Sequence, residues 1–193
     1  MPGTKHIASP MPYASTGDFD RIFHEEKDSL YRLSFLLTAD HEKAQLCFVS
    51  GVQDSVKGNP VFKEWARSWA RRTIIQSALR VINPRPTEEH DRVIFNRNRR
   101  TDAIEQGEIG AVLQLEPFER FVFVILVLEH YSEHECSLLL HGSRRDVTAG
   151  RNRALQQLRG AMELLANQPV SVGAEKPGSD DNYGSALADV LHI

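Results

Sequence analysis

Arginine and lysine side chains that could bind a polyanion are concentrated in two short stretches of the sequence. The stretch from Lys63 to Arg80 holds five basic residues and one acidic residue, and so does the stretch from Ser143 to Gly160. The 193-residue chain as a whole has a formal net charge of -3. Two basic islands in an otherwise acidic chain indicate two separate surfaces for a polyanion. The alternative is that these arginines form solvated faces and ion pairs.

Capping signals divide the region around the second island into separate helices. Pro117 suits the first position of a helix, which we expect to run to about Tyr131. Ser132 with Glu135 three residues later is a capping-box pattern, which predicts a second helix over residues 133–140.

A third helix is expected after a short turn at His141-Gly142. Ser143 would cap this helix, with Asp146 at the box position, and the helix would run to about Ala166. A short helix, a tight turn with a glycine and a longer arginine-rich helix form the layout of a helix-turn-helix, whose second helix enters the major groove of DNA. The plainer alternative is a helical hairpin with a basic outer face.

The polar side of the third helix carries the side chains expected to contact DNA. Arginine can bind guanine through O6 and N7 or bind phosphate, and a helix N-terminus adds donors for phosphate. Gly150 lies within this helix and costs about 1 kcal/mol of helix propensity relative to alanine, which predicts a weakened recognition helix. The candidate DNA-binding residues are Ser143, Arg144, Arg145, Thr148, Arg151, Asn152 and Arg153.

Apolar residues at intervals of three and four predict helices through the first half of the chain. Residues 19–37 indicate one helix or two closely joined helices, and a second amphipathic stretch follows the break at Thr38-Ala39-Asp40 and runs to about Val56. After a turn signal at Gly58-Asn59-Pro60, a further helix is expected over residues 61–82, because prolines follow it at once.

The run from Phe121 to Leu128 is β-branched and aromatic enough to be a buried strand, and periodicity cannot assign a run of this length. No second strand-like run exists to pair with it, and a lone strand would leave its backbone groups unpaired. We therefore expect a helix here and an all-α fold.

A loss of apolar content between residues 83 and 108 is typical of a solvated linker. We expect this flexible linker to join two small helical domains, at residues 18–82 and 109–166. Residues 1–17 and most of the acidic tail at 167–193 are expected to be disordered.

The composition excludes several classes of protein. With 41% apolar residues the chain can form a buried core, but no apolar run approaches the length of about 20 residues that a membrane-spanning helix needs. The first 17 residues lack the apolar centre of a signal peptide, so export is not expected. Cys47 and Cys136 lie far apart, which fits buried thiols in a reducing cytoplasm.

Neither a metal centre nor an active site is expected. His130, His134, Cys136 and His141 lie close in sequence, but Ser132 places a helix boundary between the first two. The chain has no nucleophile elbow, metalloprotease motif or phosphate-binding glycine loop. We therefore expect no cofactor and no enzymatic activity.

The second helical block resembles a known family. The stretch from Leu115 to Ser132 closely resembles region 4 of the extracytoplasmic-function (ECF) sigma factors of bacterial RNA polymerase. The resemblance continues through Glu135, Leu140, Val147, Arg153-Ala154 and Leu158-Arg159. In that family region 4 is a helix-turn-helix that recognises the upstream, minus-thirty-five promoter element.

The first block resembles region 2 of the same family, which captures and melts the downstream, minus-ten element. The resemblance covers residues 19–37 with Asp40, Glu42 and Ala44, and then Trp65 to Arg80. Bases of an opened strand stack on aromatic rings while cations bind its backbone. Trp65 and Trp69, however, are four residues apart on an apolar stripe, where such a pair is more often core. The expected contacts to the melted strand are therefore Arg67, Arg71, Arg72 and Arg80.

Several positions depart from the family pattern. Gln45 to Ser50 replaces an acidic stretch that binds polymerase, and Arg72 replaces an asparagine. The resemblance implies an ECF-type sigma factor that binds core RNA polymerase and promoter DNA in the cytoplasm, with an anti-sigma factor as a further partner. The alternative is a sigma-like helix-turn-helix regulator or a protein-interaction module that no longer initiates transcription.

Overall fold

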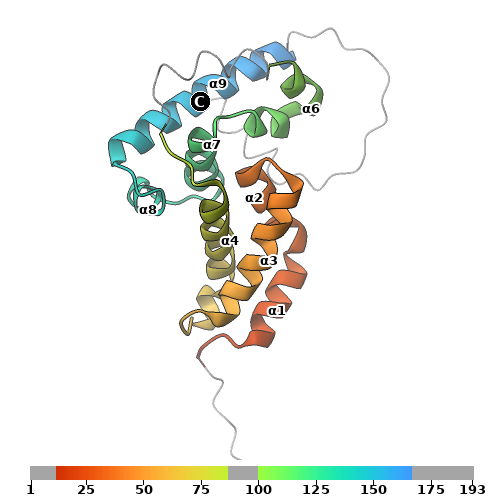
Figure 1. Ribbon diagram of the computed structural model, residues 1–193, viewed down its shortest axis with the longest axis vertical. Helices are drawn as coiled ribbons and strands as arrows, with labels where there is room; N and C mark the ends of the chain where they lie inside the picture. The colour runs from red at the N-terminus through yellow and green to blue at the C-terminus, as the bar shows by residue number, and fades with distance from the viewer. Residues whose placement is uncertain (1–11, 87–99, 167–193) are drawn as a thin grey trace, which may run out of the picture.

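The computed structural model describes residues 12–86 and 100–166, and their secondary structure is helical apart from one isolated bridge between Tyr13 and Phe62. The expected all-α fold is confirmed for these residues. Figure 1 shows α1 to α4 side by side along the long axis of the molecule, with α9 across one end. The elements are α1 (Thr16–Glu25), α2 (Lys27–Thr38), α3 (His41–Lys57), a 3-10 turn (Lys63–Trp65), α4 (Ala66–Ile82), α6 (Arg100–Leu113), α7 (Pro117–Phe123), a π-helical turn (Val124–Leu128), α8 (Glu133–Leu139) and α9 (Arg144–Ala166).

Local capping chemistry sets the helix starts in the first half. Ser15 forms a capping box with Asp18, and these hydrogen bonds, led by the one from the Ser15 backbone, lower the pKa of Asp18 to about 2. Asp40 caps α3 by accepting a hydrogen bond from the Lys43 backbone N–H at 2.9 Å. Residues 19–37, for which one helix or two closely joined helices were expected, thus belong to two helices, α1 and α2.

The start of α4 differs from the prediction because the preceding residues pair with the N-terminal segment. The Ala14 N–H donates to the Val61 carbonyl at 2.7 Å, and the Lys63 N–H donates to the Pro12 carbonyl at 3.0 Å. This pairing holds Val61 and Phe62 extended, so the α-helix begins at Ala66. Residues 12–17 of the expected disordered start are thus ordered, whereas residues 1–11 lie outside the described part.

Apolar contacts continue across the expected domain boundary. One cluster of buried residues includes Leu33 and Leu37 of α2 together with Leu115, Phe118 and Phe121 of the second block. Arg120 joins the blocks as well, because its Nε donates to the Leu37 carbonyl at 3.2 Å.

The second block also begins earlier than expected, since α6 starts at Arg100, inside the linker assigned to residues 83–108. Residues 87–99 of that linker and the tail at 167–193 lie outside the described part. The division into two separate domains stays a prediction.

The apolar run Phe121–Leu128 is helical, but its second half has π-helical hydrogen bonding. The Glu129 N–H donates to the Val124 carbonyl, five residues back, at 2.9 Å. His130 follows with a left-handed φ of 57°, which ends the helix before Tyr131, where the sequence placed its end. The chain therefore changes direction between the run and α8.

No helix in residues 12–86 or 100–166 combines the length and the apolar composition that crossing a membrane requires. The buried apolar residues lie between the packed helices instead.

Gly150 marks a close approach between α7 and α9. An added Cβ there would lie 2.9 Å from a ring carbon of Phe118 and 3.3 Å from a methyl of Val122. Both neighbours are fully buried and have little room to move. Gly150 therefore lowers the helix propensity of α9 but also allows α7 to pack closely against it.

We expect Gly150→Ala to destabilise the protein by about 1 kcal/mol or more, because the overpacking cost exceeds the gain in helix propensity of about 1 kcal/mol. Gly160→Ala is the matched control on the same helix, since nothing lies within 4 Å of its added Cβ. This second variant should stabilise the chain by up to about 1 kcal/mol. Urea unfolding followed by circular dichroism measures both, and equal stabilisation by the two alanines would contradict the packing argument.

Candidate nucleic-acid interface

The segment predicted to be a helix-turn-helix forms the two capped helices and the short turn that the sequence predicts. Ser132 and Ser143 each accept a hydrogen bond from the backbone N–H three residues on, at 3.2 and 3.1 Å. The carboxylates of Glu135 and Asp146 accept the N–H groups of Ser132 and Ser143 in return, at 3.0 and 3.1 Å. Hydrogen bonds from the capping serines lower the pKa of both carboxyl groups. The starts of α8 and α9 are thus both capped as the sequence predicts.

The turn between α8 and α9 uses a left-handed residue, but this residue is His141, with φ 51°, and not the glycine beside it. The Gly142 N–H donates to the Ser137 carbonyl at 3.1 Å, which closes the end of α8. Val147 and Ala154 of α9 and Cys136 of α8 are fully buried. This packing leaves the opposite side of α9 in solvent.

The N-terminal half of α9 presents most of the expected DNA contacts to solvent. Neither the Arg144 nor the Arg145 guanidinium lies within 4.0 Å of a carboxylate of the described residues. Arg151 has only a loose pair with Glu133, at 3.8 Å and with both side chains nearly half exposed. The exposed residues are Ser143, Arg144, Arg145, Thr148, Arg151 and Asn152.

Arg153, the last residue of the expected set, points inward instead. Its Nε donates to Oε1 of Glu119 at 2.7 Å, and the Glu119 side chain is only 1% exposed. The Glu119 carboxylate is buried and needs a cation, so Arg153 joins α9 to α7 in this conformation. We therefore leave Arg153 out of the candidate DNA surface.

Three of the four arginines of α4 have carboxylate partners, as the ion-pair alternative for the first basic island predicts. Arg67 pairs with Glu25 at 2.8 Å and with Glu26, and Arg80 pairs with Asp54. The Arg71 guanidinium binds the Glu129 carboxylate through two hydrogen bonds of 2.6 Å.

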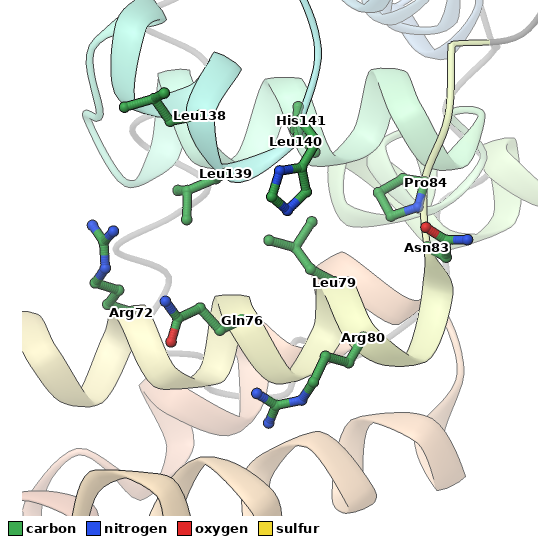
Figure 2. Close-up of a pocket in the computed structure, with 10 residues that line it drawn as sticks. All are labelled: Arg72, Gln76, Leu79, Arg80, Asn83, Pro84, Leu138, Leu139, Leu140 and His141. Atoms are coloured by element: carbon green, nitrogen blue, oxygen red, sulfur yellow. The ribbon is translucent and has the colours of Figure 1, made fainter. Parts of the chain in front are cut away.

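Arg72 lies at a cavity between α4 and α8 (Figure 2). The cavity has a volume of about 460 Å³, and Arg72 and Gln76 of α4 lie on one side of it, with Leu139 and His141 opposite. Arg80 extends from α4 in a different direction, toward α3, where it reaches Asp54. Arg72 is therefore the arginine of α4 that faces the helix-turn-helix segment across open space.

Trp65 is a surface residue, contrary to its assignment to the core. It is 59% exposed and makes an edge-on contact with Phe62 at 5.3 Å between ring centroids, and Phe62 stacks on Tyr13 at 4.9 Å. Trp69, four residues on, is half-buried against Gly58 as the core interpretation predicts. The exposed rings of Tyr13, Phe62 and Trp65 lie beside Lys63, so they form an aromatic and basic surface that the apolar stripe did not reveal.

The stretch from Gln45 to Ser50, which departs from the family pattern, lies on α3 and alternates between core and solvent. Cys47 is buried, whereas Leu46 and Val49 are exposed, and Val56 continues the exposed apolar side further along the helix. Isolated apolar side chains on a surface are common, but three along one helix form a candidate protein-contact stripe.

Within the described ranges, no three histidine, cysteine, aspartate or glutamate side chains gather as they would around a metal ion. His130, His134, Cys136 and His141 thus do not form such a group. Comparisons of the chain with models of protein families, with curated proteins and with solved structures found no match.

Proposed function

We propose that this chain is an ECF-type sigma factor, which binds core RNA polymerase and recognises promoter DNA in the cytoplasm. One observation carries the proposal: a capped helix-turn-helix presents Arg144, Arg145 and Arg151 on the exposed N-terminal half of its second helix. A recognition helix needs cations in that position, where the helix N-terminus adds donors for phosphate. Because this segment resembles sigma region 4, we infer that the nucleic acid it binds is promoter DNA.

The first block carries the surfaces that we assign to the melted promoter strand and to core polymerase. The exposed rings of Tyr13, Phe62 and Trp65 provide stacking faces for an opened strand, and the half-exposed ammonium of Lys63 beside them is held only by an ion pair of 3.5 Å with Asp18. The exposed apolar stripe of Leu46, Val49 and Val56 is the surface that we assign to core polymerase. An anti-sigma factor would compete for the same surfaces.

Two measurements test this proposal. Purified protein should co-elute with core RNA polymerase in gel filtration, and its binding to a labelled promoter duplex should weaken steeply as salt rises. Absence of any complex, under conditions in which an established ECF sigma factor forms one, would exclude the initiating role.

A second candidate function is a sigma-like regulator that binds proteins and no longer initiates transcription. The observation that favours it is the pairing of Arg67, Arg71 and Arg80 with carboxylates, which occupies cations expected to hold a melted strand. For this candidate, affinity for a protein partner should change little with salt, because the exposed stripe on α3 is apolar.

A further inference from the structure

One contact between the two helical blocks uses an arginine that the proposed function needs elsewhere. Arg71 of α4 is expected to hold the melted strand, yet its Nε and Nη2 donate to the two carboxylate oxygens of Glu129 at 2.6 Å each. Its Nη1 also donates to the Ser29 hydroxyl at 3.1 Å. A two-bonded guanidinium–carboxylate pair is both strong and directional. Glu129 therefore occupies one two-donor edge of the Arg71 guanidinium, and the Nη1 on its other edge lies 3.8 Å from a carboxylate oxygen of Glu26, so little of the group is left for a phosphate in this geometry.

The backbone of the second block places Glu129 for this contact. Glu129 directly follows the π-helical turn, and His130 follows it with φ 57°, so the chain turns away at this point to begin α8. The Glu129 side chain is only 3% exposed, whereas that of Arg71 is 24% exposed. A carboxylate buried to this degree needs its cation, so the pair favours the packed arrangement of the blocks over the separated one.

The same arrangement puts α8 in front of the polar side of α4. Arg72 and Gln76 face Leu139 and His141 across the cavity of about 460 Å³ (Figure 2). Close packing is thus missing at this end of the contact, and the Arg71–Glu129 pair is a directional interaction in a loosely packed region. A strand bound along α4 would have to displace both Glu129 and α8.

We propose that Arg71 and Glu129 form a closing pair, which adds to the shared apolar cluster and to the Arg120–Leu37 hydrogen bond in holding the two blocks together, in a form that cannot bind a melted strand. This proposal rests on the proposed function. A bound strand and the Glu129 carboxylate would both need the Arg71 guanidinium. The free energy of the Arg71–Glu129 pair therefore reduces the affinity for the strand. The structure is accordingly the inhibited form, and Glu129 must leave Arg71 before α4 engages DNA.

The test is Glu129→Gln, which keeps the side-chain shape and removes the charge that the second block places against Arg71, while Glu26 of the first block stays beside it. Glu116→Gln is the matched control, because it makes the same change of net charge and its side chain makes no capping hydrogen bond. The separation of the blocks is followed by the distance between spin labels at Lys57→Cys and Gln156→Cys, two exposed positions on α3 and α9. The native Cys47 and Cys136 are buried and should stay unlabelled.

We expect Glu129→Gln to lengthen and broaden the label distance and to raise affinity for a labelled single-stranded oligonucleotide by about tenfold, since more of the population becomes competent to bind. The control should change neither. If Glu129→Gln leaves the label distance unchanged, the closing pair is overturned. If the distance lengthens but the affinity for the oligonucleotide equals that of Glu116→Gln, the inhibitory role of the pair is overturned.

Exchanging the charges guards against a variant that is merely unstable. Arg71→Glu alone should open the blocks, and Arg71→Glu with Glu129→Arg should restore the short distance. Failure of the exchange to restore it, with both variants folded by circular dichroism, would also overturn the pair. The label distance needs no nucleic acid, so an absence of polymerase and duplex binding by the wild-type chain counts against the proposed function alone.

Discussion

Replacing Arg144 and Arg145 together by alanine should weaken binding to a promoter duplex by roughly a hundredfold, because each arginine of a recognition helix contributes about 1–3 kcal/mol. Both guanidinium groups are exposed at the start of α9, where they can reach phosphate or a guanine edge. The slope of log affinity against log salt should become shallower by about 1 for each phosphate that the variant no longer neutralises. Fluorescence anisotropy with a labelled duplex over a range of salt concentrations measures both quantities.

The control for this prediction removes two exposed charges from the first block, by Arg21→Ala with Lys27→Ala. This control should reduce affinity only slightly, since exposed charges farther than a Debye length from the DNA are screened. Equal weakening by the two double variants would show that duplex binding is a diffuse electrostatic effect, and α9 would lose its role as the recognition helix.

Replacing Arg120 by alanine should lower the free energy of unfolding by about 3–5 kcal/mol, because each buried acceptor left without a donor costs about 1–3 kcal/mol. Its side chain is buried, with the residue 4% exposed. The guanidinium donates to the carbonyls of Leu37, Leu113 and Leu115, at 3.2, 3.2 and 3.0 Å. Alanine leaves all three carbonyls without this donor and removes a link between α2 and the second block.

Urea unfolding followed by circular dichroism measures this loss. Arg120→Lys should recover part of the stability, because an ammonium can still donate to these carbonyls but cannot reproduce the planar fork of the guanidinium. Arg21→Ala serves as a surface control and should stay within about 0.5 kcal/mol of the wild-type protein. A stability of Arg120→Ala inside that same interval would contradict the role of the buried guanidinium.

Features that depend on neighbouring residues could be predicted from the sequence. The capping boxes at Ser132 and Ser143 are decided by residues three positions apart, and both form as expected. The same holds for the end of α4 at Asn83, whose φ of 49° closes the helix just before a proline. The helix at Phe121 to Leu128 follows by elimination, because the run has no strand to pair with.

Features that depend on distant residues could not be predicted in this way. A helix through Trp65 would place this side chain on the apolar stripe, but pairing of the preceding residues with Pro12 and Ala14 starts the helix after it. Arg153 and Arg71 each bind a carboxylate that lies tens of residues away, at Glu119 and Glu129. Charge counts along the sequence identify such cations but not their partners.

Gly150 shows how one residue can be interpreted in two ways. From the sequence it reduces helix propensity, and that cost is real for any helix. In the structure its missing side chain lets α7 approach α9 with Phe118 in between. Helix propensity depends only on the residue and its neighbours in sequence, so it could not reveal that Gly150 allows α7 to pack closely on α9.

The two buried thiols have a consequence for chemical signalling. Burial raises the pKa of Cys47 to about 11 and that of Cys136 to about 12, so both thiols stay protonated at neutral pH. Peroxide attacks the thiolate form, and neither sulfur is accessible to solvent. A peroxide signal would therefore not be read by either thiol while the chain keeps this fold.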